Sequence, residues 1–497
     1  MLGSPIPSHP VVSAEEARTL EATLLGGDEA REWKAMQSAG KGVAASILRD
    51  FAEAGALPAN ARILVLAGKG NNAGDALIAA EEILLRVPAA TADVLFAFGP
   101  RKLRALAAKA WTGLSQSARS RVRIVEPATL SASYDIAVDG IFGFQFRPPL
   151  PQEAIDAIAA ADTCSIRFRA AVDLPSGLDG AGAFKADFTY ATGSAKADLL
   201  GCANAGRPRY LDLGFFEAAD RNGGTDRVIL SSILRPLAAL RPASSDKRAQ
   251  GHLAIVGGSG NFPGAILMCT LAALRSGVGL VTAYVPERLV PGYAARAPEA
   301  MWVGLPETAS GALGTRGLSR VMEGTERASA LVIGPGLGRE SASLALAKSI
   351  VRASKVPLVI DADALQPDIV RLGKAPKVLT PHAGEFKRIA KGADLKHLSR
   401  ELSAVVVAKG PVTRICSGGA IFHSFFGGPV LSRGGSGDVL AGLTGGLLAQ
   451  NPADPLAAGC RAAVWHGMAA DLLAQSKGQT AVDILQLLDC LPAALRS

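Results

Sequence analysis

A chain of 497 residues is too long for one ordinary domain, and a hydrophobic content of 49% predicts more than one large core. Aromatic residues make up only 5%, and the 55 glycines favour α/β layers with glycine loops at the strand ends. The net charge of +8 contains no dense Lys/Arg run interleaved with aromatics, which argues against nucleic acid as a partner.

The cysteines and the start of the chain predict its compartment. None of the six cysteines forms a CxxC pair, so we expect free thiols in a reducing environment. The Pro/Ser-rich residues 1–10 lack the pattern of a secretory signal. The apolar stretch Ala265–Leu274 is interrupted by Arg275 and is too short to cross a bilayer. We therefore expect a soluble, cytoplasmic protein with no membrane partner.

The first part of the chain alternates short apolar runs with helical patterns. A helix is predicted to begin after Ser13, because Ser13 and Glu16 have capping-box spacing. The run Arg62–Ala67 predicts a buried strand, and the glycine loop Gly68–Gly74 precedes a helix from Asp75 to about Arg86. Further strands are predicted at Ala92–Ala97, Asp135–Val138 and Ala170–Leu174. This order is typical of a mostly parallel sheet.

A cluster of breakers, Arg221–Asp226, predicts a domain boundary, with domains over residues 1–225 and 226–497. The second block is expected to repeat the pattern after its own helical lead-in and to end in helices from Gly437 onward. Its predicted strands are Leu253–Val256, Leu280–Val285, Leu331–Ile333, Leu358–Ile360, Val378–Leu379, Ala404–Val407, Arg414–Cys416 and Ala420–His423. The blocks share no sequence, so the chain is a fusion of two three-layer α/β/α domains.

Four strand-to-loop junctions of the second block combine glycines with polar side chains. In a parallel sheet such junctions gather along one edge, where ligands bind. They are Val256-Gly-Gly-Ser-Gly-Asn-Phe-Pro-Gly-Ala265, Ile333-Gly-Pro-Gly-Leu-Gly338, Thr380-Pro-His-Ala-Gly-Glu385 and Arg433-Gly-Gly-Ser-Gly-Asp-Val-Leu-Ala-Gly442.

The fourth junction predicts a phosphoryl-transfer site. Gly434, Gly435 and Gly437 leave backbone N–H groups accessible at the start of a helix, whose N-terminus attracts anions. Asp438 lies in the first helical turn and is placed to accept a proton from a hydroxyl that attacks phosphorus. The alternative is that Asp438 only caps its helix.

With the other junctions, residues 226–497 resemble the ribokinase-like ADP-dependent NAD(P)HX dehydratases, through GGSGNFPGA, ALRSGVGLVT, IGPGLG, IDADAL, TPHAGEF, KGPVT and GGSGDVLAG. One departure is Gln366, where the family usually has Asn. The resemblance implies a ribokinase-like fold and Mg²⁺ bound with ADP. The residues that it implies for contact with the adenine nucleotide are Lys409, Gly410, Pro411, Val412, Thr413 and Gly437. Those that it implies for the hydrated dinucleotide are Ala265, Gly336, His382 and Asp438.

The chemistry of such a site follows from the substrate. The hydrate carries a hydroxyl on a ring carbon bonded to the ring nitrogen. Phosphorylation turns this hydroxyl into a good leaving group, and the nitrogen lone pair expels it. A kinase site therefore becomes a dehydratase without new catalytic residues. His382, at the end of a predicted strand, is expected to contact the ligand, although a structural hydrogen-bonding role stays open.

In the first block, three polar segments each follow an apolar strand: Gly68–Asp75, Val138–Gly143 and Val172–Gly177. Their side chains Asn72, Asp139, Asp173 and Ser176 are expected to meet at one edge of the sheet. Such oxygen donors suit an alkali cation better than zinc, which prefers Cys or His. Gly68–Asp75 before a helix also suits a diphosphate.

Across residues 13–220, these segments resemble the YjeF N-terminal-domain family, the NAD(P)HX epimerases, whose domain is Rossmann-like. The resemblance implies that Asn72, Asp139 and Ser176 hold K⁺ and that Asp173 transfers the proton that lets the hydrate's carbon centre invert. The residues that it implies for contact with the hydrated dinucleotide are Asn71, Asn72, Ala73, Gly74, Asp75, Gly143, Phe144, Gln145, Phe146, Arg147, Pro148, Pro149 and Asp173.

Three residues depart from the epimerase pattern. Ala73 and Ala76 replace two glycines, and Gln145 stands where a small residue is usual. If position 73 requires a positive φ, alanine costs roughly 1 kcal/mol or more. Lys196 matches a family lysine in type, but the sequence assigns it no role.

These observations predict a bifunctional enzyme that epimerises the R and S hydrates of NADH and NADPH and dehydrates the S form, with conversion of ADP to AMP and phosphate. One alternative is a small-molecule kinase of a vitamin precursor. Another is a first domain that only binds nucleotides. The resemblance also suggests a homo-oligomer, and the sequence does not decide between ADP and ATP.

Overall fold

The computed structural model describes residues 5–216 and 224–496. Two compact units are present, and each is described by itself. The N-terminal unit comprises His9–Gly224 together with Ala474–Gln479, and the C-terminal unit comprises Met1–Ser8, Thr225–Leu473 and Thr480–Ser497. Residues 221–223 of the predicted boundary cluster lie outside the described residues.

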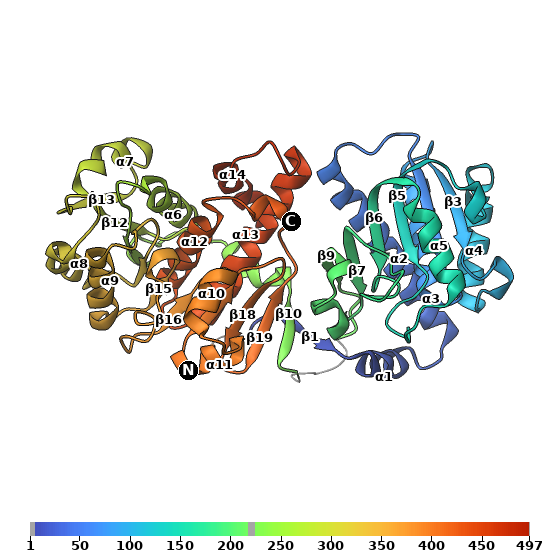
Figure 1. The fold of residues 1–497 in the computed structure, drawn as a ribbon, viewed down its shortest axis with the longest axis horizontal. Helices are drawn as coiled ribbons and strands as arrows, with labels where there is room; N and C mark the ends of the chain where they lie inside the picture. The colour runs from blue at the N-terminus through green and yellow to red at the C-terminus, as the bar shows by residue number, and fades with distance from the viewer. Residues whose placement is uncertain (1–4, 217–223, 497) are drawn as a thin grey trace. The chain divides into compact units, whose positions relative to one another are not determined.

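The N-terminal unit contains a parallel sheet (Figure 1). Its strand order is β4 (Val122–Ile124), β3 (Thr91–Phe96), β2 (Arg62–Ala67), β5 (Ser133–Gly140), β6 (Ser165–Val172), β7 (Phe188–Thr192) and β9 (Arg207–Leu211). Its helices are α1 (Ala14–Leu25), α2 (Glu29–Phe51), α3 (Asn71–Arg86), α4 (Ala105–Ser117) and α5 (Gln152–Asp162). A short parallel pairing joins β1 (Ser8–Val12) to β8 (Ala195–Lys196).

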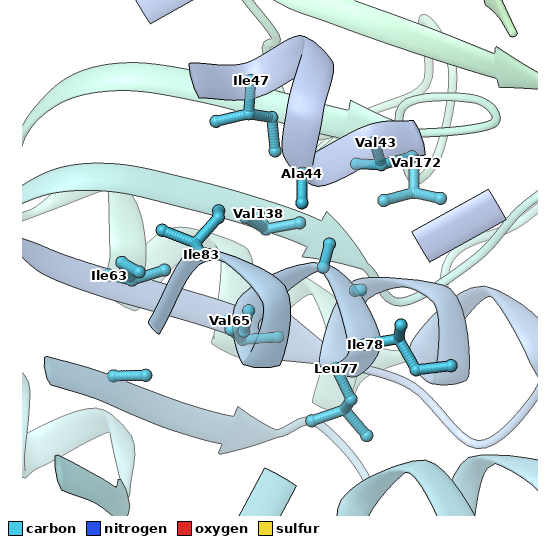
Figure 2. Close-up of a cluster of buried hydrophobic side chains, with 14 of the residues drawn as sticks. Val43, Ala44, Ile47, Ile63, Val65, Leu77, Ile78, Ile83, Val138 and Val172 are labelled. Atoms are coloured by element: carbon cyan, nitrogen blue, oxygen red, sulfur yellow. The ribbon is translucent and has the colours of Figure 1, made fainter. Parts of the chain in front are cut away.

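Alternate residues of β2 face opposite sides of this sheet and give the unit its three layers. Ile63 and Val65 belong to a buried cluster with side chains of α2, α3 and α4, part of which Figure 2 shows. Leu64 and Leu66 belong to a second cluster with side chains of α5. A strand buried on both faces explains why this segment is a continuous apolar run in the sequence.

The C-terminal unit also contains a largely parallel sheet, with helices over both faces (Figure 1). Its strand order is β13 (Met301–Leu305), β12 (Leu280–Pro286), β11 (His252–Val256), β14 (Ala330–Ile333), β15 (Leu358–Ile360), β16 (Lys377–Leu379), β17 (Val405–Ala408), β18 (Thr413–Ser417), β19 (Ala420–Ser424) and β10 (Asp226–Ile229). Among these strands of the described residues, the β17–β18 and β18–β19 pairings are antiparallel and the others are parallel.

The helices of this unit separate into two layers. One buried cluster joins Leu331 and Ile333 of β14 to α9, α10 and α11, while the α12 residue Gly445 lies against Val332 on the other face. The helices are α6 (Pro263–Arg275), α7 (Val290–Arg296), α8 (Leu318–Thr325), α9 (Ser341–Ala353), α10 (Ala383–Ala390), α11 (Leu395–Leu402), α12 (Ser436–Gln450), α13 (Pro455–Lys477) and α14 (Leu485–Ala494). The expected α/β class with mostly parallel sheets is confirmed.

Some local predictions need correction. The helix predicted from Asp75 begins at Asn71, so most of the expected glycine loop is already helical. The helical lead-in expected for the second block is only a 3₁₀ segment, Ser231–Leu237, which contains a proline. Several strands had no apolar alternation to reveal them; an example is β9, which reads Arg-Pro-Arg-Tyr-Leu. A short strand with charged residues and a proline carries too weak a pattern to be recognised, whereas short apolar runs such as Leu358–Ile360 are confirmed as strands.

The structure also tests the predictions of free thiols and of the absence of a membrane-spanning segment. Cys164, Cys202, Cys269, Cys416 and Cys460 are free thiols, as expected. Within residues 5–216 and 224–496, no helix combines the length and the hydropathy needed to cross a bilayer.

Candidate active sites

The carboxyl ends of three neighbouring strands of the N-terminal unit open into a cavity of about 470 Å³. Asn71 and Asn72 follow β2, Phe142 and Gly143 follow β5, and Asp173 directly follows β6. Strands that run parallel end at the same edge, so these loops meet although they lie far apart in the sequence. The structure thus brings together the polar segments identified in the sequence.

Asp173 is the most constrained residue of this cavity. It is only 4% exposed and has a φ of 66°, a left-handed conformation that is rare for a residue with a side chain. Its Oδ2 accepts a hydrogen bond from the Phe144 N–H at 2.9 Å, and its Oδ1 accepts one from the Lys196 ammonium. Such strained, over-determined residues concentrate at functional sites.

Lys196 is a functional candidate to which the sequence assigned no role. It is 1% exposed and also donates to the Thr192 carbonyl at 3.0 Å. A buried ammonium needs a partner of opposite charge, and Asp173 supplies it. The sequence signal was a lysine inside an otherwise small and apolar segment.

A second network lies directly behind this pair. The Ser176 hydroxyl and N–H each donate to Asp139 at 2.7 Å, and the Phe142 N–H donates to the Ser176 Oγ at 2.9 Å. The Asn72 amide donates to the Phe142 carbonyl at 2.9 Å. Burial raises the pKa of Asp139 to about 6, and hydrogen bonds from Ser176 and Ile141 oppose that shift. The three predicted cation ligands therefore belong to one connected cluster.

Gly143 connects the two networks. A Cβ at this position would lie 2.9 Å from Asp173 Oδ2 and 3.2 Å from Asn72 Oδ1. Any larger side chain would separate these two oxygen atoms, so glycine is required for the close approach.

The two alanines that replace family glycines do not strain the loop. Ala73 and Ala76 are fully buried inside α3, and neither has a positive φ. The cost considered for Ala73 therefore does not arise. Ala76 instead packs against Gly140 of β5, where an added Cβ would lie 2.5 Å from the Ala76 Cβ.

The expected substrate-contact residues fall into two groups. Those that line the cavity are Asn71, Asn72, Asp75, Gly143, Phe144, Gln145, Phe146, Arg147 and Asp173. Ala73 and Gly74 are buried in α3, and Pro148 and Pro149 are exposed outside the lining. Further lining residues that the motifs did not indicate include Glu21, Lys69, Phe98, Arg104, Thr192 and Lys196.

In the C-terminal unit, α12 begins at a glycine that no other residue can replace. Gly435 has a φ of 92°, and a Cβ there would lie 2.4 Å from Met268 Sδ on α6. This contact places the glycine junction against the helix that carries Ala265. No side chain caps the N-terminus of α12, and the Ser436 N–H donates to the Arg433 carbonyl at 3.3 Å, which leaves the Gly437 N–H to face an anion.

Asp438 lies in the first turn of α12. Its pKa is raised to about 7, mainly by burial and next by the neighbouring Asp361, while Lys409 opposes the shift. A carboxyl group with such a pKa accepts a proton readily near neutral pH, as a general base must. Asp438 makes no N-cap hydrogen bond, so the capping alternative is not supported.

Lys409 connects the ends of three strands. Its Nζ donates to Asp361 Oδ1 at 3.2 Å and lies 3.9 Å from Glu385 Oε2. A Cβ at Gly437 would lie 3.1 Å from the same Nζ. Lys409 follows β17 directly, and Gly410–Val412 form its turn into β18, which begins at Thr413. The expected nucleotide residues Lys409 and Gly437 are thus neighbours.

His382 has a structural role at the start of α10. This role exists whether or not the side chain also contacts the ligand. Its Nδ1 accepts the Gly384 N–H at 3.0 Å and caps α10, while the Glu385 carboxylate accepts the His382 N–H at 2.9 Å. The imidazole remains 59% exposed, and its Nε2 lies 3.5 Å from Glu385 Oε1, so a ligand would approach the ring beside this carboxylate.

Ala265 and Gly336 also lie together. Gly336 has a φ of 62°, and its Cβ would lie 3.0 Å from the Ala265 Cβ and 2.4 Å from the Phe262 carbonyl oxygen. Gln366 is the residue that departs from the dehydratase pattern. Its side chain donates to the Asp363 carbonyl at 2.9 Å and so remains within its own loop.

The fold and these two constellations define a two-unit α/β enzyme with a carboxylate-centred site in each unit. Residues 253–493 match the family described as NAD(P)H-hydrate dehydratase, and residues 33–197 match the YjeF-related protein N-terminus. The chain is 34% identical to the bifunctional NAD(P)H-hydrate repair enzyme Nnr of Moorella thermoacetica, over 93% of this chain and 92% of that protein. The identity with the Gloeobacter violaceus enzyme is 36%, over 95% of each. The chain belongs to the bifunctional NAD(P)H-hydrate repair enzymes.

Solved structures also resemble part of the chain. The ADP/ATP-dependent NAD(P)H-hydrate dehydratase from Bacillus subtilis, co-crystallised with ATP and Mg²⁺, is 26% identical, with a TM-score of 0.46 over 54% of this chain and 96% of that chain. A ribokinase-like superfamily protein from Enterococcus faecalis is 28% identical, with a TM-score of 0.48 over 56% of this chain and 98% of that one.

The raised pKa of Asp438 predicts a pH-dependent gain in stability for Asp438→Asn. Above pH 7 the native state holds a buried charge that the unfolded state exposes to water, so removing it stabilises the fold. We expect the melting temperature of the C-terminal unit to rise at pH 8 by at least ~2–4 °C. The gain should shrink as the pH falls below 7, where the native carboxyl group is already protonated.

Differential scanning calorimetry at several pH values checks this. Asp489→Asn is the control, because the Asp489 side chain is 74% exposed and should show no pH-dependent gain. A gain for Asp438→Asn that is equal at pH 5 and pH 8 would contradict the burial argument.

Proposed function

We propose that the N-terminal unit interconverts the R and S hydrates of NADH and NADPH, and that the C-terminal unit dehydrates the S form. The second reaction converts ADP to AMP and phosphate. The observation that carries this proposal is the match of nearly the whole chain to bifunctional repair enzymes, together with an aspartate near a lysine in each unit, buried in the case of Asp173 and half-buried in the case of Asp438. The free cysteines suit work in the reducing cytoplasm.

In the N-terminal unit, Asp173 is the proton-transferring group. Its carboxylate is held by Lys196 and by the Phe144 N–H, so it reaches the cavity in one fixed orientation. Asn72 and Asp75 line the same cavity beside the N-terminus of α3, where partial positive charge attracts the diphosphate of the dinucleotide.

The cluster behind Asp173 fits a potassium ion. Asp139 is fully buried and forms no salt bridge within the described residues, so its charge is compensated only by hydrogen bonds and by Arg169, which acts without an ion pair. Asn72 Oδ1 accepts no hydrogen bond in the same part of the chain. We propose that Asn72, Asp139 and Ser176 hold K⁺, whose positive charge would stabilise the buried carboxylate and fix the Phe142–Gly143 loop.

In the C-terminal unit, Asp438 accepts the proton of the hydrate's hydroxyl group as the oxygen attacks the terminal phosphorus of ADP. AMP leaves with the electrons of the broken P–O bond, and Mg²⁺ enters with the nucleotide and balances its charge. The N–H groups of Gly435 and Gly437 receive the transferring phosphoryl group, and Lys409 faces the same space. The nitrogen lone pair of the ring then expels phosphate, and loss of a ring proton completes NADH.

The joint activity is tested with racemic hydrated NADH, ADP, Mg²⁺ and K⁺, by following the near-ultraviolet absorbance of the reduced nicotinamide. The wild type should return all of it. Asp438→Asn should reduce the rate by about 10²-fold or more, because a general base is lost. Asp173→Asn should stop near half, because only the S form is consumed.

Two outcomes would overturn parts of the proposal. No recovery by the wild type with either ADP or ATP would favour a small-molecule kinase that releases a stable phosphate ester. Recovery by the wild type that stops at half would mean that the N-terminal unit binds nucleotides without catalysis.

Removal of potassium tests the cation site. Replacing K⁺ with tetramethylammonium should slow epimerisation roughly tenfold or more, as loss of a metal or its supporting ligands commonly does. Dehydration of pure S hydrate by the same protein should be less affected. Asp139→Asn should be slow with either cation, and an epimerisation rate independent of K⁺ in the wild type would remove the ion from the proposal.

A further inference from the structure

Glu21 lies in the cavity of the N-terminal unit but belongs to none of the motifs that define it. It is on α1, far in sequence from the loops that follow β2, β5 and β6, and its side chain lines the same cavity as Asp173. Its carboxylate has no hydrogen bond and no salt bridge within residues 5–216 and 224–496. A half-buried acid without a partner is costly to the fold unless it serves the ligand.

Burial keeps a large fraction of Glu21 protonated near neutral pH. Its pKa is raised to about 7, mainly by burial; Lys196 lowers it, and Asp173 and Glu32 raise it. Burial also raises the pKa of Asp75 well above its usual range, with Asp173 and Glu21 contributing. Since Lys196 is already paired with Asp173, the cavity contains one committed ion pair and two acids with raised pKa values, of which Asp75 is the more deeply enclosed by the protein and Glu21 is the more accessible.

Other cations line the cavity without neutralising Glu21. Lys69 lies over the Phe98 ring at 4.0 Å, and its backbone carbonyl accepts the Arg104 N–H at 2.8 Å. None of Lys69, Arg104 and Arg147 forms a salt bridge with Glu21 in the described part of the chain. These cations are suited to bind the phosphates of the dinucleotide. Glu21 is therefore available to act on the nicotinamide ring.

We propose that Glu21 is a second proton-transferring residue of the epimerisation site and works together with Asp173. The inference rests on the proposed epimerase function. Inversion at the hydroxyl-bearing ring carbon requires one group that takes a proton and another that gives one. A paired Asp173 and an unpaired, protonated Glu21 in one cavity meet this requirement.

The step balances as a ring opening followed by closure. Asp173 accepts the hydroxyl proton, an oxygen lone pair forms a C=O bond, and the bond from this carbon to the ring nitrogen breaks. The nitrogen receives the bonding pair and a proton from Glu21. Rotation about the adjacent carbon–carbon bond turns the other face of the aldehyde to the nitrogen. The reverse steps return both protons and close the ring to either epimer.

The test compares Glu21→Gln with the wild type in epimerisation of pure R hydrate, with calorimetric binding of racemic hydrated NADH measured in parallel. We expect kcat to fall by about 10²-fold or more while binding is retained. Glu21→Asp keeps the acid and should recover part of the rate. Glu15→Gln is the matched control on α1, because the Glu15 side chain is 82% exposed, and it should behave as wild type.

The pH profile separates a chemical role from a structural one. Glu21 must carry its proton to act as an acid, so wild-type kcat/KM should fall as the pH rises through about 7. Glu21→Gln should lack this alkaline limb. Equal kcat for Glu21→Gln and wild type, or a lowered rate with an unchanged alkaline limb, would overturn the proposal. A wild type with no epimerisation would instead overturn the proposed function itself.

Discussion

Both sites depend on an aspartate whose carboxylate is placed where water is scarce and close to one lysine. Asp173 is paired with the buried Lys196, and Asp438 lies near Lys409, which partly offsets the effect of burial on its pKa. A buried charge interacts strongly with few neighbours, so small changes in those neighbours decide whether the group holds a proton. The same constraint extends to Glu21 and Asp139, which are the acids without a lysine of their own.

The parallel sheet makes this arrangement possible in each unit. Strands that all run in one direction bring their following loops to a single edge, and helices cover both faces and exclude water. Local backbone geometry then sets the final positions: Asp173 adopts a positive φ, Gly143 permits two oxygens to approach, and Gly435 starts α12 against Met268. The two units share no sequence, yet a sheet of mostly parallel strands gives each of them a site at the carboxyl ends of its strands.

The sequence predicted features that depend on residues close together in the chain. It missed features that depend on contacts between residues far apart in the chain. The Ser13–Glu16 capping box and the strand Arg62–Ala67 are confirmed, because their signals are local. The pairing of Lys196 with Asp173 spans 23 residues and an intervening strand, and only the fold creates it. Glu21 enters the cavity from a helix whose own pattern shows nothing but amphipathicity. The early start of α3 was hidden because asparagine and glycine usually signal a loop.

The central claim is that the two units perform different steps on one substrate. It is tested most directly with pure R hydrate of NADH, ADP, Mg²⁺ and K⁺, and an equimolar mixture of the Asp173→Asn and Asp438→Asn proteins. The account predicts that the mixture returns all of the reduced nicotinamide, while Asp438→Asn alone returns it about 10²-fold more slowly or less and Asp173→Asn alone only as fast as spontaneous epimerisation allows. Recovery by Asp173→Asn alone at the wild-type rate, or no recovery by the mixture, would contradict it.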